Sequence, residues 1–186
     1  MSNILLGASA SVSVYKACDL ASKLTQAGHA VRAVLTRRAA SLVSPQLFEA
    51  VTGLRTFVHE VDAQRQGAMD HIELAKWAHL VVIAPASADL IGRLSHGLAD
   101  DLVTTAALAL PGDVPRLLAP AMNPHMLTHP AVRRNLDRLV SDGWRTIEPE
   151  IGHTACGDEG RGRLAEPSKI AERVVAVLAL DSEGRK

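Results

Sequence analysis

Four segments of the sequence carry small or hydroxyl-bearing residues directly after a short apolar run. Small side chains let a backbone approach a ligand, and hydroxyl groups together with helix N-terminal N–H groups bind phosphate. Serine and threonine are also common as plain helix caps, so any single one could have only that role. The coincidence of four segments favours a shared anionic ligand. The segments are Gly7-Ala8-Ser9-Ala10-Ser11, Thr36, Pro85-Ala86-Ser87 and Pro120-Ala121-Met122-Asn123.

The first of these segments differs from a dinucleotide-binding loop. Such a loop has the pattern G-x-G-x-x-G, and an acidic residue at the end of the second strand binds the ribose. The segment that begins at Gly7 lacks the second and third glycines, and Thr36 stands where the acidic residue would be. This pattern disfavours NAD and favours a mononucleotide such as FMN.

His71 is the first candidate for proton transfer. Asp70 and Glu73 have the spacing of a capping box, which would place His71 in the first turn of a helix. The helix dipole disfavours an imidazolium there, so a neutral imidazole that accepts a proton near pH 7 is expected. The alternative is an exposed first-turn histidine without a catalytic role.

Asn123 and Cys156 are two further candidates. The amide of Asn123 follows an apolar run and could hydrogen-bond a substrate carboxylate, or it could only cap the next helix. Cys156 lies in the glycine-rich segment 152–163, which is too rich in glycine for a regular element and is typical of a functional loop. Its thiol is either a proton donor or nucleophile, or a free surface thiol. Cys18 lies on an apolar helical face and is expected to pack in the core.

A metal site is disfavoured. His125 and His129 are four residues apart, but no glutamate occupies the metalloprotease position and Pro130 follows at once. We therefore expect no metal ligand set.

The elements that must position these residues alternate between strand and helix. Continuous apolar runs are typical of strands buried on both faces of a parallel sheet, and helical spacing between them indicates crossover helices. The alternation predicts a single-domain α/β fold with a doubly wound parallel sheet, in which ligands bind beyond the carboxyl ends of the strands. We expect this domain over residues 1–180 and a polar tail over residues 181–186. The predicted strands are residues 4–6, 31–35, 80–84 and 117–119, and the helices fall at 14–24, 89–94, 102–110, 132–140 and 170–178.

Composition excludes several classes of function. The 186 residues are 47% hydrophobic and 22% charged, which is ordinary for one globular domain. The formal net charge is zero and no long basic run is present, so we expect neither a nucleic-acid partner nor an anionic membrane surface. The N-terminal segment lacks a signal-peptide pattern, and no apolar run reaches 18 residues. A soluble, cytoplasmic protein is expected.

Seven short segments, taken in their order along the chain, resemble the flavin-containing cysteine decarboxylases. Among these, they are most similar to the enzymes that act on phosphopantothenoylcysteine. The similarity runs from residue 4 to about residue 177, and the fixed order of many short motifs makes it specific. The matching segments are residues 7–16, 35–39, 70–78, 84–90, 97–102, 120–126 and 155–158.

The resemblance implies a Rossmann-like, flavodoxin-like fold and a trimer that holds FMN between neighbouring subunits, with a trimer-based dodecamer in bacterial members. It implies that the FMN phosphate lies around Ser9 and Ser87, with Thr36 nearby. The full set of expected cofactor contacts is Gly7, Ser9, Ser11, Thr36, Ser87, Ala88 and Met122.

The resemblance also implies roles in catalysis. His71 matches the active-site histidine of the family, Asn123 the asparagine that binds the substrate carboxylate, and Cys156 the cysteine of a loop that covers the substrate and supplies a proton. The other implied substrate contacts are Met126, Ala155 and Gly157.

The implied reaction is the FMN-dependent decarboxylation of 4′-phospho-N-pantothenoylcysteine to 4′-phosphopantetheine in coenzyme A biosynthesis. Oxidation by the flavin would give a thioaldehyde, decarboxylation an enethiolate, and return of the hydride the product. The implied partners are this small molecule, further copies of the chain and a phosphopantothenate–cysteine ligase, fused or separate.

A peptidyl-cysteine oxidative decarboxylase of the lantibiotic type is the alternative. It shares the oxidative half-reaction but leaves reduced flavin behind, and Cys156 in its Ala-Cys-Gly-Asp setting favours the complete reaction. A phosphatase-inhibiting flavin-binding subunit typically carries an acidic tail that this sequence does not show. A prenyl-flavin synthase would leave His71 and Cys156 unexplained.

Overall fold

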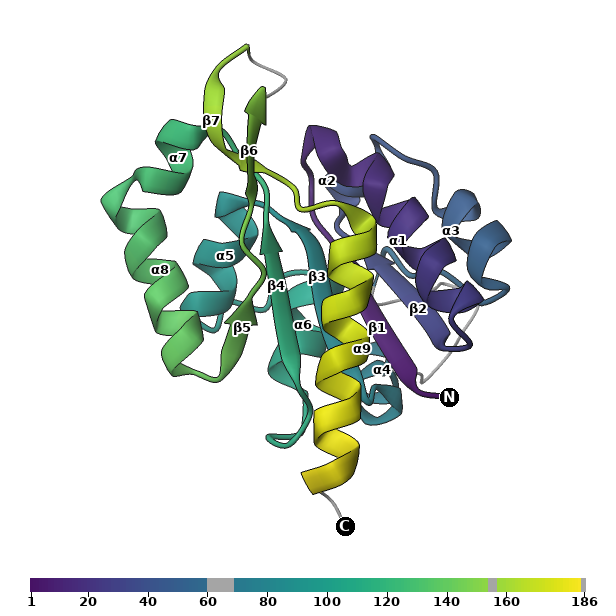
Figure 1. The fold of residues 1–186 in the computed structure, drawn as a ribbon. Helices are drawn as coiled ribbons and strands as arrows, with labels where there is room; N and C mark the ends of the chain where they lie inside the picture. The colour runs from purple at the N-terminus through teal and green to yellow at the C-terminus, as the bar shows by residue number, and fades with distance from the viewer. Residues whose placement is uncertain (60–68, 154–156, 185–186) are drawn as a thin grey trace.

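Five parallel strands form the central sheet of the computed structural model, which describes residues 1–59, 69–153 and 157–184 (Figure 1). The sheet order is β2-β1-β3-β4-β5, so the strand order reverses between β1 and β3. This confirms the predicted doubly wound α/β fold. The strands are β1 (Asn3–Ala8), β2 (Ala30–Leu35), β3 (Leu80–Ala86), β4 (Arg116–Pro120) and β5 (Trp144–Thr146).

Helices cover both faces of this sheet (Figure 1). The four predicted strands lie within observed strands, and the five predicted helices overlap observed helices, although the one predicted over 102–110 ends at Leu108. The helix α1 ends two residues before Gly28, which has a positive φ of 85°. The helices are η1 (Val12–Val14), α1 (Tyr15–Gln26), α2 (Arg37–Ala40), α3 (Pro45–Thr52), α4 (Asp70–Trp77), α5 (Ala88–Ser95), α6 (Leu102–Leu108), α7 (Pro124–Thr128), α8 (Pro130–Ser141) and α9 (Pro167–Gly184).

Two apolar cores sandwich the sheet. Successive side chains of a strand point to opposite faces, so Ile4 and Leu6 belong to one core while Leu5 belongs to the other. The first core is closed by α1, α3 and α9, and the second by α4, α5, α6 and α8. Cys18 is half-buried against the first core, and burial, followed by the charge of Asp19, raises the pKa of its thiol.

The helix α9 is longer than the sequence pattern indicated. It continues from Pro167 to Gly184, so residues 181–184 extend a helix where a polar tail was expected to begin. No strong helix breaker interrupts the chain before Gly184, which explains the extension. No helix in the described part of the chain is long and apolar enough to cross a membrane.

A two-stranded antiparallel hairpin, β6 (Glu150–His153) and β7 (Glu159–Arg163), extends past the carboxyl ends of the parallel strands (Figure 1). The expectation of a loop over residues 152–163 is wrong for residues 152–153, which belong to β6, and for β7. Glycine is unusual in a strand, but here it allows close approach to another backbone. A Cβ added at Gly162 would lie only 2.2 Å from the carbonyl oxygen of Met122.

Candidate functional site

Ser9 joins the loops that follow β1 and β3, at the point where the strand order reverses. Its N–H and its hydroxyl both donate to the carbonyl oxygen of Pro85, at 3.0 and 2.9 Å, and its Oγ accepts the N–H of Ser87 at 2.8 Å. Ser9 is only 2% exposed. Its hydroxyl proton is therefore committed to Pro85, and Ser9 shapes the loops that would face an anion.

The other hydroxyl-bearing residues of this region are helix caps. Ser87 accepts the N–H of Leu90 at the start of α5, and Thr36 accepts the N–H of Ala39 at the start of α2. Ser11 caps the short helix η1. The capping interpretation is thus correct for all three, and it is compatible with a ligand site because caps stand at helix N-termini, where N–H groups attract anions.

Gly7 is closely packed between β3 and α6. A Cβ at Gly7 would lie 3.2 Å from Cγ1 of Ile83 and 3.2 Å from Cγ1 of Val103, so the side chains of β3 and α6 already fill this space. A residue with a side chain would require these two side chains to shift by a few tenths of an ångström. Gly7 therefore supports the site by letting α6 lie close to β1.

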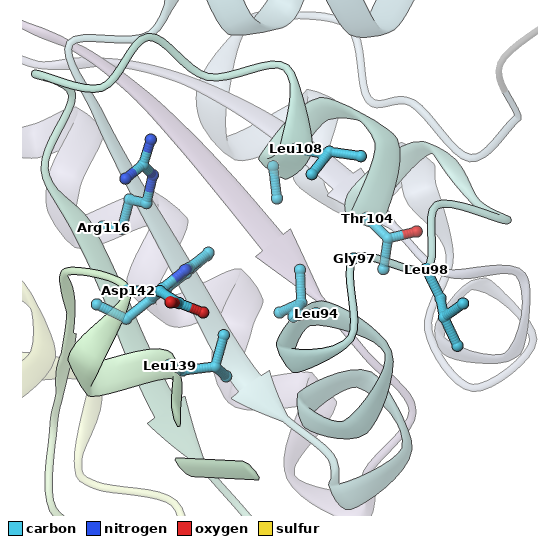
Figure 2. A pocket seen from close by; sticks show the side chains of 10 residues that line it. Leu94, Gly97, Leu98, Thr104, Leu108, Arg116, Leu139 and Asp142 are labelled. Carbon is cyan, nitrogen blue, oxygen red and sulfur yellow. The ribbon is translucent and has the colours of Figure 1, made fainter. Parts of the chain in front are cut away.

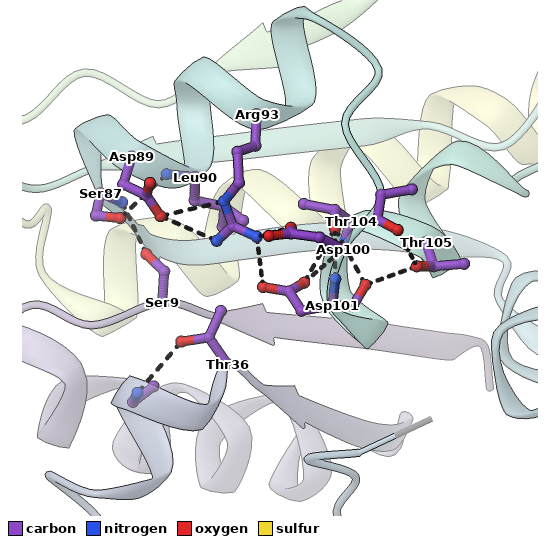
Figure 3. A network of polar contacts seen from close by, with 12 residues as sticks. Ser9, Thr36, Ser87, Asp89, Leu90, Arg93, Asp100, Asp101, Thr104 and Thr105 are labelled. Atoms are coloured by element: carbon purple, nitrogen blue, oxygen red, sulfur yellow. Dashed lines mark hydrogen bonds and ion pairs between the residues drawn. The ribbon is translucent and has the colours of Figure 1, made fainter. Parts of the chain in front are cut away.

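Arg93 ties α5 to the segment that leads into α6 (Figure 3). Its guanidinium contacts Asp89 at 3.0 Å, Asp100 at 2.6 Å and Asp101 at 2.7 Å, and its side chain is 17% exposed. Burial opposes its charge, but the hydrogen bonds to Asp101 and Asp100 outweigh burial and raise the pKa of Arg93. The same hydrogen bond lowers the pKa of Asp100. Asp101 also forms a capping box with Thr104 at the start of α6.

Replacing Arg93 with methionine should lower the free energy of unfolding by about 1–2 kcal/mol. The change leaves half-buried Asp101 without its cationic partner, although two of the three carboxylates are well exposed and contribute little. Urea unfolding would measure the loss. Arg134→Ala, which changes an exposed arginine on α8, is the control; equal stability of both variants would contradict a structural role for Arg93.

His71 lies in the first turn of α4, as predicted, and is half-buried. The predicted capping box is wrong. The N-cap is Met69, which makes no side-chain capping bond, and Asp70 is inside the helix and 1% exposed. Glu73 instead reaches Arg32 of β2 at 3.2 Å, and Arg32 also stacks on Trp77 at 4.6 Å. These contacts anchor α4, and with it His71, to β2, whereas the loop of Ser9 is bonded to the carboxyl end of β3.

Asn123 caps α7 and is hydrogen-bonded at both ends of its amide. Its Oδ1 accepts the N–H of His125 at 2.8 Å, and its Nδ2 donates to Oδ2 of Asp158 at 2.5 Å. The N–H of Met122 donates to the carbonyl oxygen of Gly162 at 3.0 Å. The loop after β4 is therefore bound to the β6–β7 hairpin.

Two of the remaining predicted substrate contacts, Met126 and Gly157, lie among the described residues. Met126 is on α7 and 48% exposed, and Gly157 has a φ of 85°, which favours glycine. Ala155 and Cys156 fall outside the described residues. His129 caps α8 by accepting the N–H of Ala131 at 3.2 Å, and the described part of the chain holds no group of three potential metal ligands.

Several residues of this region were not singled out from the sequence. The ion pair of Arg93 could have been predicted from Asp89, which lies four residues earlier on the same helix face. The capping role of Asp101 could have been predicted from its spacing to Thr104. Asp158 had no local signal, because its partner Asn123 is 35 residues away.

A groove of about 180 Å³ lies elsewhere, among the ends of α5, α6 and α8 and the start of β5 (Figure 2). Four leucines, Ala107 and Trp144 form its apolar lining, and Arg116, Asp142 and Thr104 supply polar groups. None of the predicted site residues that the structure describes lines it. The groove is therefore separate from the serine loops and the hairpin.

Comparison with known proteins gives consistent similarities. The family model described as "Flavoprotein" matches residues 1–179. The coenzyme A biosynthesis bifunctional protein CoaBC of Bacillus subtilis (strain 168) is 45% identical over 170 residues, which are 91% of this chain and 41% of that protein. The chain thus spans less than half the length of this relative.

Two solved structures extend the comparison. A cysteine-to-serine mutant of PPC decarboxylase, complexed with pantothenoylaminoethenethiol, is 32% identical with a TM-score of 0.83, covering 95% of this chain and 97% of that one. The FMN-dependent cysteine decarboxylase SpaF is 31% identical with a TM-score of 0.81, covering 98% of both chains.

Proposed function

Because the chain belongs to the flavoprotein family, we propose that it is an FMN-dependent decarboxylase of 4′-phospho-N-pantothenoylcysteine, forming 4′-phosphopantetheine in coenzyme A biosynthesis. The observation that carries this proposal is the similarity, over 95% of the chain, to a PPC decarboxylase that binds pantothenoylaminoethenethiol. The 45% identity to a protein named for coenzyme A biosynthesis supports the same substrate.

The loops at the strand-order reversal fit the phosphate of FMN. The first N–H groups of a helix lack partners within the helix. At the start of α5, the hydroxyl of Ser87 accepts the N–H of Leu90. The N–H groups of Ala88 and Asp89 begin the same turn, where a phosphate can accept them. Ser11, Thr36 and Met122 complete the proposed contacts from the neighbouring loops.

The chain's own residues supply binding and proton transfer. FMN, when bound, supplies the two-electron acceptor and donor that a cysteine carboxylate needs, because this carboxylate has no electron sink of its own. We assign to Asn123 the binding of the substrate carboxylate and to His71 the acceptance of the thiol proton that the cysteine loses on oxidation. Cys156 is assigned the donation of a proton to the product, with Met126, Ala155 and Gly157 as substrate contacts.

The wider assignments follow the same family pattern. We propose a trimer, or a dodecamer built from trimers, in which FMN lies between subunits. Residues 1 to about 180 form the decarboxylase domain, acting in the cytoplasm with a phosphopantothenate–cysteine ligase that is fused or separate. The description of the B. subtilis relative as bifunctional supports such a partner.

The purified protein should carry a flavin spectrum, release FMN on denaturation and convert 4′-phospho-N-pantothenoylcysteine to 4′-phosphopantetheine. Mass spectrometry of the reaction would detect the loss of carbon dioxide without net oxidation. Decarboxylation of a peptide with a C-terminal cysteine is the second candidate, and the similarity to the FMN-dependent cysteine decarboxylase SpaF is compatible with it. Turnover of the peptide alone, with an oxidised enethiol product, would reverse the assignment, and a colourless protein that binds no FMN would refute both.

A further inference from the structure

The orientation of the Asn123 amide is fixed by its two neighbours. The N–H of His125 can only donate, so the amide atom that faces it at 2.8 Å is the oxygen. The NH₂ group therefore lies on the other side, where a carboxylate oxygen of Asp158 accepts one of its hydrogens at 2.5 Å. The hydrogen-bond network itself thus settles which end of the amide is which.

Asp158 is brought to this place by the backbone of β7. It immediately precedes Glu159, the first residue of β7, and Gly162 of the same strand accepts the N–H of Met122 at 3.0 Å. The contact is so close that a Cβ at Gly162 would lie 2.2 Å from the carbonyl oxygen of Met122. The residue before Asn123 and the strand after Asp158 are therefore held as one unit.

We propose that Asp158 is a positioning residue for the substrate carboxylate. An amide NH₂ group has two hydrogens, and Asp158 takes one of them, which prevents rotation of the Asn123 side chain. The second N–H then has a fixed direction and is available to the carboxylate of the cysteine. This inference rests on the proposed function and adds to it a residue that acts on the substrate through Asn123.

The test compares Asp158→Ala with Asp158→Asn in the FMN-bound protein. Alanine should raise KM for 4′-phospho-N-pantothenoylcysteine roughly tenfold, because the amide loses one of its two restraints. The affinity for 4′-phosphopantetheine, which has no carboxylate, should change less than about twofold. Asparagine retains an oxygen that accepts the Asn123 N–H, so KM should stay within about threefold of the original.

The control is Glu159→Ala, which changes the exposed neighbour of Asp158 and should leave both constants unaltered. An unchanged or lower KM in Asp158→Ala would overturn the inference, and so would equal losses of substrate and product affinity, since these indicate a purely structural role. Retained FMN and an unaltered circular dichroism spectrum exclude unfolding as the cause. Failure of the original protein to decarboxylate the substrate would instead refute the proposed function.

Discussion

Asparagine in place of His71 is expected to lower kcat for decarboxylation by roughly 10²- to 10⁴-fold, the usual contribution of a general acid or base, while FMN stays bound. The amide is close to imidazole in size but does not accept a proton near pH 7. FMN should remain because the proposed phosphate contacts belong to the loops of Ser9 and Ser87, whereas His71 lies on α4. Release of carbon dioxide and the visible flavin spectrum measure the two effects.

His59→Asn is the matched control, because His59 is exposed and has no assigned role. It should keep full activity. Two outcomes would contradict the assignment of His71. Full turnover by His71→Asn would remove its catalytic role, and loss of FMN together with activity would mean that His71 supports the cofactor site.

Gly162→Ala is expected to cause the largest structural effect. The added methyl group would lie 2.2 Å from the carbonyl oxygen of Met122, and a backbone atom cannot yield without movement of the whole loop after β4. Overpacking of this kind costs about 1–3 kcal/mol of unfolding free energy, and the clash with backbone favours the upper end. Displacement of β7 also separates Asp158 from Asn123, so KM for the carboxylate substrate should rise.

The same hairpin offers the control. A Cβ at Gly152 of β6 meets only side-chain atoms of Arg163, the nearest at 3.5 Å, which is an ordinary contact. Gly152→Ala should therefore leave stability and KM close to the original values. Urea unfolding and substrate titration of the two variants check the prediction; equal stability of Gly162→Ala and Gly152→Ala would show that the loop after β4 adapts freely.

The local sequence pattern was sufficient to predict the elements that contain continuous apolar runs. Residues 80–84 lie within β3, where all seven residues are buried, so the run directly reports a strand covered on both faces. The strand β5 is only three residues long and buries Trp144 alone, and such a short edge strand leaves no run to recognise. The strand β7 has the composition of a loop because its two glycines serve contacts with a distant segment: Gly162 lies against the backbone of Met122, and Gly160 against the ring of Pro124.

In the candidate site, too, residues with a local role could be predicted from the sequence, whereas contacts between distant segments could not. Ser87 and Thr36 were found because small residues after a strand have a local meaning at a helix start. The bond between Ser9 and Ser87 joins positions 78 residues apart, and that between Asn123 and Asp158 joins positions 35 apart. Such pairs follow from how β1 lies beside β3 and from how the hairpin folds back, and neither is encoded in local spacing.

The bridging hydroxyl of Ser9 has a kinetic consequence. Because one buried residue links the loop after β1 to the carboxyl end of β3 through three hydrogen bonds, two of them made by its hydroxyl, the proposed phosphate site is held together by contacts within the chain itself. Ligand capture then costs little ordering entropy at these loops, as is usual for preorganised sites. Reconstitution of the stripped protein should accordingly be a simple one-step encounter, with a rate proportional to free ligand concentration and no slow refolding phase.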